Sequence, residues 1–267
     1  MTDSKPTDGQ TERSAPPQAT RKPLTTTHHG ITLVDDYDWL RAENWQEVMR
    51  KPDTLAPDIR AYLEAENDYT QHALSEVSDL QDTLFAEMKA RLKEDDRQVP
   101  QPDGPYEYFP RFIKGGQYPQ LCRIPRGTTP ETAPVEVLLD GNVEATGKKY
   151  WSLGDAAHSP DHRLFAYAVD DKGSELYTIR IRDIATGQDL PDVIPDTRGA
   201  IEWAGDSKPL FYVKVDDNHR PLFVYRHTLG LDPADDALVY EEKDQGFFVG
   251  LDSTQSHKFI LIDIHDH

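Results

Sequence analysis

Two nine-residue stretches of the chain resemble each other: Ser159–Tyr167 reads SPDHRLFAY and Ala204–Tyr212 reads AGDSKPLFY. In both, an aspartate precedes a turn, a basic residue follows, and an apolar run ends in tyrosine. A third, looser copy, TQSHKFILI, begins at Thr254, so the copies start 45 and 50 residues apart. Repeats of about 40–50 residues built from short strands are typical of β-propeller blades, so this spacing predicts a propeller.

Short runs rich in Tyr, Phe, Val and Ile, separated by Pro and Gly, fill the chain beyond Val99. Such runs, without intervening helices, predict an antiparallel, mainly β region, and a β-sandwich is the alternative to the propeller. The runs are Tyr106–Phe112, Tyr118–Ile124, Val135–Leu139, Leu164–Val169, Leu176–Arg182, Leu210–Val215, Leu222–Thr228, Leu238–Glu241 and Phe259–Ile264. Residues 106–267 have room for about three to three and a half blades, whereas propellers close with about four to eight. We therefore expect an incomplete ring in this chain.

Three segments are expected from the composition along the chain. Residues 1–23 are rich in Ser, Thr, Gln, Pro and Lys without periodicity, which predicts a disordered tail. Residues 24–98 carry helical patterns: Pro57 begins one helix at its first turn, and Ser78 is the expected N-cap of a second. Residues 99–267 form the partial propeller.

The charge balance limits the classes of partner. The chain has 48 acidic and 29 basic residues, a net charge of −19 and a mean hydropathy of −0.71. Nucleic acids and anionic membrane surfaces need clustered Lys and Arg, so neither is an expected partner. The negative charge suits cationic ligands, or keeps the protein soluble. No run approaches 18 apolar residues and Met1–Lys22 lacks a signal-peptide core, so we expect a soluble, cytoplasmic protein.

The common catalytic motifs are missing from the sequence. It contains no Gly-x-Ser-x-Gly, His-Glu-x-x-His, Gly-x-Gly-x-x-Gly or P-loop pattern, and Gly173-Ser174 falls in an expected hairpin connection. The single cysteine, Cys122, excludes an internal disulfide and lies in a strand-like run, where we expect a buried, inert thiol. We therefore expect no catalytic and no cofactor-binding residue in this chain.

Acidic runs recur at the ends of the expected elements: Asp35-Asp36, Glu94-Asp95-Asp96, Asp170-Asp171, Asp216-Asp217 and Asp235-Asp236. Aspartate at such positions bonds to nearby backbone, so turn formation is the preferred interpretation. A negative rim that attracts cationic peptides is the alternative.

The chain ends on His265-Asp266-His267, which invites a metal-site interpretation. On a strand the two histidines would leave the same face, about 6.6 Å apart. A third zinc ligand would have to come from elsewhere, so we interpret this segment as a solvated strand end and expect no metal site.

Longer stretches resemble the prolyl oligopeptidase family of serine peptidases, most closely its oligopeptidase B branch. They run in order through residues 24–267. Among them are DDYDWLRAENWQEV (35–48), IRAYLEAENDYTQHAL (59–74), LFAEMKARLKEDDRQVP (84–100), YEYFPRFIKGGQYPQLCR (106–123) and SPDHRLFAYAVDDKGSELYTIRIRD (159–183). Two residues depart from the family pattern: Gln117 stands where a lysine is usual, and His162 replaces a common turn glycine.

The resemblance implies an N-terminal helical segment, a seven-bladed β-propeller that restricts entry to short peptides, and a C-terminal α/β-hydrolase domain that carries the Ser-Asp-His triad. We therefore expect a mainly β chain with an incomplete propeller of about three to three and a half of seven blades, preceded by the helical segment, with the hydrolase domain absent. Oligopeptidase B-like members cleave after Arg or Lys. The expected partners in the intact enzyme are thus short basic peptides and the missing hydrolase domain, and this chain alone should be inactive.

Two further expectations follow from this interpretation. The helix beginning near Ser78 should lack part of its partner surface, which leaves an exposed apolar stripe: Leu80, Leu84, Met88 and Leu92. The alternative function is a stand-alone half-propeller that binds a second chain or dimerises through its open strand edges.

Overall fold

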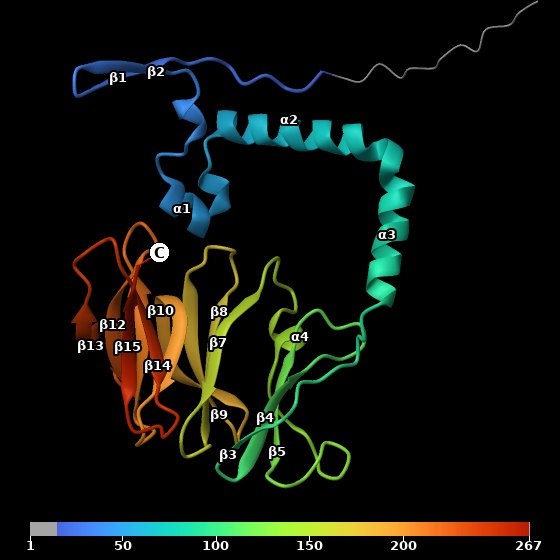
Figure 1. The fold of residues 1–267 in the computed structure, drawn as a ribbon, viewed down its shortest axis with the longest axis vertical. Coiled ribbons are helices and arrows are strands. Elements are labelled where there is room, and N and C mark those ends of the chain that lie inside the picture. Colours follow the sequence, from blue (N-terminus) through green and yellow to red (C-terminus); the bar gives the residue numbers. More distant parts are fainter. Residues whose placement is uncertain (1–14, 267) are drawn as a thin grey trace, which may run out of the picture. The chain divides into compact units, whose positions relative to one another are not determined.

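The computed structural model describes residues 15–266, which divide after Lys93 into two compact units. The first unit contains a hairpin of β1 (Leu24–His28) and β2 (Ile31–Asp35), and the helices α1 (Trp45–Arg50), α2 (Pro57–Leu74) and α3 (Ser78–Ala90) (Figure 1). Most of the predicted tail lies outside the described residues. In its last part, the carbonyl of Thr20 accepts a hydrogen bond from Trp39 Nε1, and Lys22 Nζ lies 4.1 Å from the Trp39 ring centroid.

The two long helices of the first unit bury little apolar surface. Helix α2 begins with Pro57 at its first turn, as predicted, because proline has no N–H to leave unpaired there. The prediction that Ser78 caps α3 is wrong: a 3₁₀ turn, Ser75–Val77, leads directly into the helix, so Ser78 is already helical. The apolar stripe is exposed as predicted, although Leu92 lies beyond the helix end; the exposed fractions of Leu80, Leu84, Met88 and Leu92 are 55, 46, 59 and 71%.

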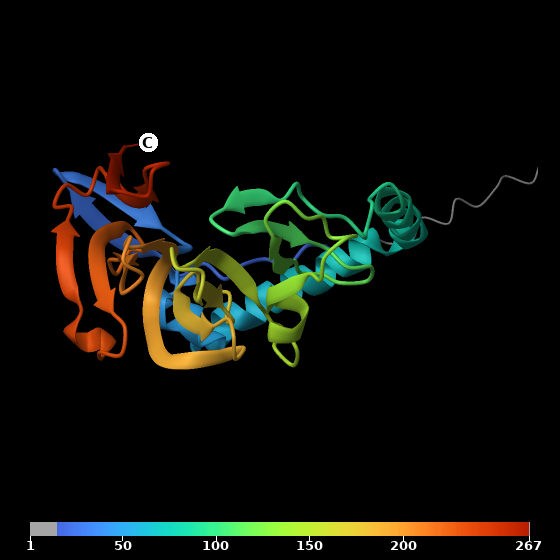
Figure 2. The same cartoon turned by 90° about the horizontal axis from the view of Figure 1, so that it is seen from below.

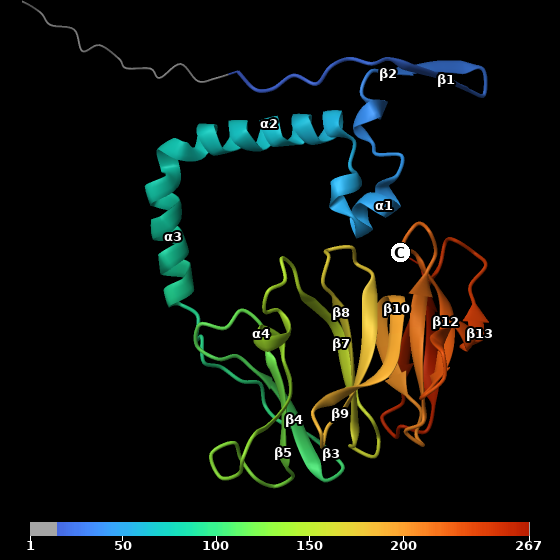
Figure 3. The same cartoon turned by 180° about the vertical axis from the view of Figure 1, so that it is seen from behind.

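The second unit consists of antiparallel sheets. One sheet has the order β3-β4-β5-β6, a second runs without interruption from β7 to β13 (Figure 3), and β14 pairs with β15. The strands are β3 (Gln101–Asp103), β4 (Tyr106–Arg111), β5 (Gln120–Pro125), β6 (Glu136–Asp140), β7 (Ser152–His158), β8 (Leu164–Asp170), β9 (Tyr177–Asp183), β10 (Gln188–Trp203), β11 (Pro209–Val215), β12 (Pro221–Thr228), β13 (Ala237–Glu241), β14 (Phe248–Ser253) and β15 (Ile260–His265). A short helix that the sequence did not predict, α4 (Gly141–Glu144), follows β6.

Strand β10 belongs to two blades. It pairs with β9 from Gln188 to Thr197 and with β11 from Thr197 to Trp203. Asp196 and Gly199 have positive φ angles of 56° and 101° beside this junction, and the strand bends as it passes from one partner to the next (Figure 2). The described residues therefore form three four-stranded blades (β3–β6, β7–β10 and β10–β13) and the half-blade β14–β15, which confirms the predicted partial propeller.

The nine predicted strand runs are all strands, but the first strand of each blade was missed, as was the fourth strand of the second blade, which is the first part of β10. The missed first strands are β3, β7, the second part of β10, and β14. The hairpin β1–β2 of the first unit was also missed. The main buried cluster lies in the second and third blades and comprises Ala166, Ala168, Ile179, Ile181, Ile194, Ile201, Trp203, Leu210 and Tyr212.

The two clearest sequence repeats have equivalent structures. Asp161 accepts a hydrogen bond from the backbone of Arg163, and Asp206 accepts one from Lys208, so each aspartate closes the turn between the first two strands of its blade. In the second blade, buried Tyr167 donates to Asp189 at 2.7 Å.

In the third blade the equivalent tyrosine, Tyr212, donates to Asp236 at 2.8 Å. A side chain of the third strand completes each network, Arg182 in the second blade and His227 in the third. The repeat thus encodes a polar network that ties the second, third and fourth strands of a blade. Among the described residues, the helices are all too short or too polar to cross a membrane.

Candidate functional site

The first strands of the blades converge on a cavity of about 340 Å³. Asp103 from β3, His158 from β7, Glu202 from β10 and Ser253 from β14 line it, together with His257 from the β14–β15 turn. First strands surround the axis of a propeller, so this cavity lies on the surface that would face the central channel of a closed ring.

Three carboxylates lie along the first strands of the three four-stranded blades: Asp103, Asp155 and Glu202. Burial raises the pKa of Asp155, opposed by hydrogen bonds from the backbone N–H groups of Ile201 and Ala156. Burial also raises the pKa of Glu202. Burial opposes ionisation of Asp103 as well, but the hydrogen bond from His158 and its charge outweigh it and hold the pKa of Asp103 below the usual range. Each of the first three blades thus places one carboxyl group on its first strand.

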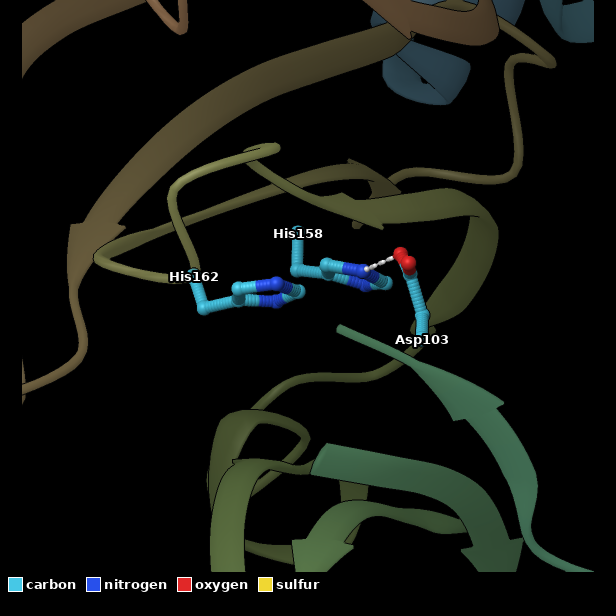
Figure 4. Close-up of side chains that lie close together, drawn as sticks. All are labelled: Asp103, His158 and His162. Atoms are coloured by element: carbon cyan, nitrogen blue, oxygen red, sulfur yellow. Dashed lines mark hydrogen bonds and ion pairs between the residues drawn. The ribbon is translucent and has the colours of Figure 1, made fainter. Parts of the chain in front are cut away.

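Asp103 also belongs to a cluster with two histidines. Among the residues that the structure describes, Asp103, His158 and His162 form a group whose potential metal-ligating atoms all lie within 4.8 Å of one another. His158 Nε2 lies 2.7 Å from Asp103 Oδ2, and Figure 4 shows His158 between His162 and the carboxylate. Asp103 comes from the first blade and both histidines from the second, so the cluster lies between two blades.

Aromatic and polar contacts from the first blade fix both rings. Tyr108 stacks on His158 with 3.8 Å between ring centroids and an interplanar angle of 4°, and its hydroxyl lies 2.8 Å from His162 Nδ1. Arg123 Nη1 donates to the carbonyl of His162 at 2.7 Å. Burial raises the pKa of Tyr108 to about 12 and lowers that of His158, although Asp103 opposes the second shift. The cluster therefore brings two imidazole rings and one carboxyl group together.

Cys122 is buried, as predicted. Its side chain is buried in β5, with 2% exposed, and burial raises the pKa of the thiol to about 11. A thiol with this pKa holds almost no thiolate at neutral pH, so Cys122 is a poor nucleophile.

The acidic runs form turns in most places, with one correction. Asp35 accepts a hydrogen bond from the backbone of Tyr37, Asp170 accepts from three backbone N–H groups of the following residues, and Asp216 accepts from two. Turn formation is wrong for Asp236, whose carboxylate is buried and accepts from Tyr212 and His227.

The terminal histidines are not brought together with other ligands in the described part of the chain. His265 ends β15, is exposed, and has its Nδ1 2.9 Å from Asp263 Oδ2. His267 lies outside the described residues, so the solvated strand end stays a prediction.

The sequence reasoning missed Asp103, His158 and His162. His158 ends strand β7, which was not predicted. His162 was noted only as a replacement for a glycine that is common at this turn in the family. The available signal was the pair His158-x-x-x-His162 flanking the turn of the first repeat.

The comparisons with known proteins agree with this architecture. The model of the prolyl oligopeptidase N-terminal β-propeller domain matches residues 16–267. The chain belongs to the prolyl oligopeptidase family. It is 34% identical over 265 residues to dipeptidyl aminopeptidase BI of Pseudoxanthomonas mexicana, which covers 94% of this chain and 35% of that protein. It is 32% identical over 250 residues to protease 2 of Moraxella lacunata, covering 92% of this chain and 35% of that relative.

Solved structures of this family have the same fold. Oligopeptidase B from Leishmania major superposes on 94% of this chain with a TM-score of 0.85 and 28% sequence identity. The chain covers 36% of that structure, so it spans about a third of the length of these relatives. The matched part is the helical segment and the propeller. The strand pairings among residues 15–266 are all antiparallel, so the described residues contain no parallel α/β-hydrolase sheet.

Proposed function

We propose that residues 94–267 are part of the gating propeller of a serine oligopeptidase that hydrolyses short peptides after Arg or Lys. The observation that carries this proposal is the similarity to oligopeptidase B over 94% of the chain. In this proposal the 267 residues position and admit the peptide, whereas a hydrolase domain supplies the nucleophile. The chain alone is then inactive. The single cysteine fits a reducing, cytoplasmic location.

The acidic axial surface supports a preference for basic peptides. Asp103, Asp155 and Glu202 lie on the first strands of three blades, and the chain carries a net charge of −19. A channel lined by one sign of charge raises the local concentration of oppositely charged ligands. Arg- and Lys-containing peptides would therefore enter more readily than acidic ones.

The exposed apolar stripe of α3 supports the proposal that a hydrolase domain packs on the helical segment. Leu80, Leu84 and Met88 point away from any core of their own unit, and a soluble protein rarely leaves such a stripe uncovered. We assign its partner as the hydrolase domain, the surface on which the helical segment of this family packs.

Hydrolysis of a fluorogenic, N-blocked Arg-Arg amide tests the proposal. The purified 267-residue chain should give no turnover above buffer. Robust turnover that a serine-directed inhibitor blocks would overturn the assignment of catalysis to another domain.

Peptide binding tests the charge preference separately. A labelled octapeptide with two arginines should bind the chain at least tenfold more tightly than its glutamate counterpart at low salt. The variant Asp155→Asn/Glu202→Gln should lose this preference, and Asp79→Asn/Asp82→Asn, on the exposed surface of α3, is the matched control. Equal binding of both peptides would contradict an acidic gate.

Dipeptidyl aminopeptidase activity is the second candidate, favoured by the 34% identity to dipeptidyl aminopeptidase BI. Release of a dipeptide requires a free amino terminus, whereas an endopeptidase accepts a blocked one. Comparison of free and N-blocked Arg-amide substrates on the intact enzyme separates the two.

A further inference from the structure

We propose that the cavity of about 340 Å³ at the ends of the first strands binds the guanidinium group of one arginine side chain of the substrate peptide. The inference rests on the proposed preference for basic peptides and gives that preference a specific subsite. Asp103 of β3 and Glu202 of β10 contribute one carboxylate each to the cavity wall, from the first and third blades. Pro160 and His257, from the turns that follow β7 and β14, place the cavity where the first strands end.

The volume and the lining of the cavity fit one long side chain. A volume of about 340 Å³ is at the lower end of the range of about 300–1,000 Å³ that small-ligand sites span. Part of the wall is apolar and comes from Ala156, Ala157, Trp203 and Ile260. An arginine side chain has an aliphatic stem that packs on such a wall and a charged end that bonds to polar groups. The cavity offers both kinds of surface.

Glu202 is a partly buried carboxyl group that forms no ion pair within residues 15–266. Burial raises the pKa of Glu202, and the charges of Asp252 and Asp155 raise it further. Ser253 and His257 oppose this shift without removing it. The negative charge around Glu202 is therefore only partly compensated by the protein. A cation bound in the cavity would favour the charged form of this carboxyl group.

Asp103 contributes a second carboxylate with one oxygen available. His158 Nε2 lies 2.7 Å from Asp103 Oδ2 (Figure 4), whereas Oδ1 accepts no hydrogen bond from the residues that the structure describes. A guanidinium group has five N–H donors in one plane, so it can bond to two carboxylates at once. The ammonium group of lysine is a compact charge whose three donors share one atom. Carboxylates on two sides of the cavity therefore favour arginine over lysine.

Binding of matched peptides to the purified 267-residue chain tests the subsite. The probes are a labelled Gly-Gly-Arg-Gly-Gly amide and the same peptide with citrulline, a neutral analogue of arginine with nearly the same shape. At low salt the arginine peptide should bind at least tenfold more tightly. Glu202→Gln and Asp103→Asn should each reduce this ratio to below about threefold. Glu241→Gln makes the same change on the exposed outer strand β13 of the third blade and should keep the ratio.

Thermal unfolding separates a lost site from a misfolded variant. Glu202→Gln should melt cooperatively, at a Tm no lower than that of the wild type, because a neutral amide is easier to bury than a carboxylate. A saturating concentration of the arginine peptide should raise the Tm of the wild type and of Glu241→Gln, and leave that of Glu202→Gln unchanged.

Two results would overturn the inference, and they differ in their consequence for the proposed function. A preference for the arginine peptide over the citrulline peptide that survives in folded Glu202→Gln and Asp103→Asn would assign binding to another surface, and the general preference for basic peptides would stand. Equal binding of the two peptides by the wild type would remove the subsite. The preference for basic peptides would fail as well only if the arginine and glutamate octapeptides also bound equally.

Discussion

The second and third blades use the same topology to hold a tyrosine, an aspartate and a nitrogen-bearing side chain together, but they bury them to different degrees. In the third blade the His227 and Asp236 side chains are 0 and 3% exposed, and their partner Asp192, from the first part of β10, is 4% exposed. In the second blade the Arg182 and Asp189 side chains are 16 and 28% exposed. Equivalent residues of the two blades thus have similar geometry but contribute differently to the free energy of unfolding, because that contribution depends on how deeply the polar groups are buried.

The buried network around His227 is shielded from water, so its side chains bond to one another. His227 Nε2 lies 3.0 Å from Asp192 and Nδ1 lies 2.8 Å from Asp236, while Gly230 N–H and Tyr212 bond to the same two carboxylates. In the second blade, Arg182 bonds to Asp189 and Glu144 near the surface, where water can replace it.

The largest effect is expected from His227→Leu, which removes the shared partner of two buried carboxylates. We expect a loss of about 3–5 kcal/mol in the free energy of unfolding, because an uncompensated buried charge is costly. Urea denaturation measures it. A loss below about 1 kcal/mol would show that the buried network does not hold the third blade.

Arg182→Met makes the matched change in the second blade. It should cost about 1.5–3 kcal/mol of the free energy of unfolding, the usual range for hydrogen bonds to charged groups, because Asp189 and Glu144 can be solvated afterwards. The same urea titration gives the comparison. A loss as large as that of His227→Leu would mean that exposure does not distinguish the two blades.

The tyrosine hydroxyls give a smaller contrast. Tyr212→Phe should cost about 1–2 kcal/mol and Tyr167→Phe about 0.5–1 kcal/mol, since only the second leaves its aspartate partly in water. Thermal melts of the two variants, referred to the wild type, test this order. Its reversal would contradict the role assigned to burial.

Salt should produce the smallest difference. Raising NaCl from 0.05 to 0.5 M should shrink the destabilisation by Arg182→Met and leave that by His227→Leu nearly unchanged, because buried pairs are screened much less than partly exposed ones. Repeating both urea titrations at the two salt concentrations measures it, and equal salt dependence would argue against it.

The sequence predicted the second and third strands of all three blades, but missed the first strand of each blade and the fourth strand of the second blade. The outer strands carry apolar and aromatic runs, as in Leu164–Val169, which mark a strand packed on both faces. The first strands crowd near the axis and use small or polar residues, such as Gly154 in β7, where a Cβ would lie 2.7 Å from the ring of Tyr177. A strand such as β7, with the sequence SLGDAAH, has no run of β-branched residues to recognise. The repeat spacing still revealed the propeller, because turns and outer strands recur with the blade.

The candidate site was hidden for the same reason. Asp103 and His158 lie on two of these first strands, and 55 residues separate them in the chain. Cys122 and the turn-forming aspartates could be interpreted from local sequence alone. The contacts of Asp236 and of the histidine cluster depend on how strands and blades meet, which no local pattern encodes.

A chimeric enzyme tests the central claim, that this chain gates a peptidase. Residues 16–267 would replace the matching segment of protease 2 from Moraxella lacunata, and kcat/KM would be measured for an N-blocked Arg amide and for an unfolded protein substrate. The account predicts that the chimera cleaves the Arg amide and leaves the protein intact. A chimera that melts cooperatively yet degrades the protein as readily as the short substrate would contradict it.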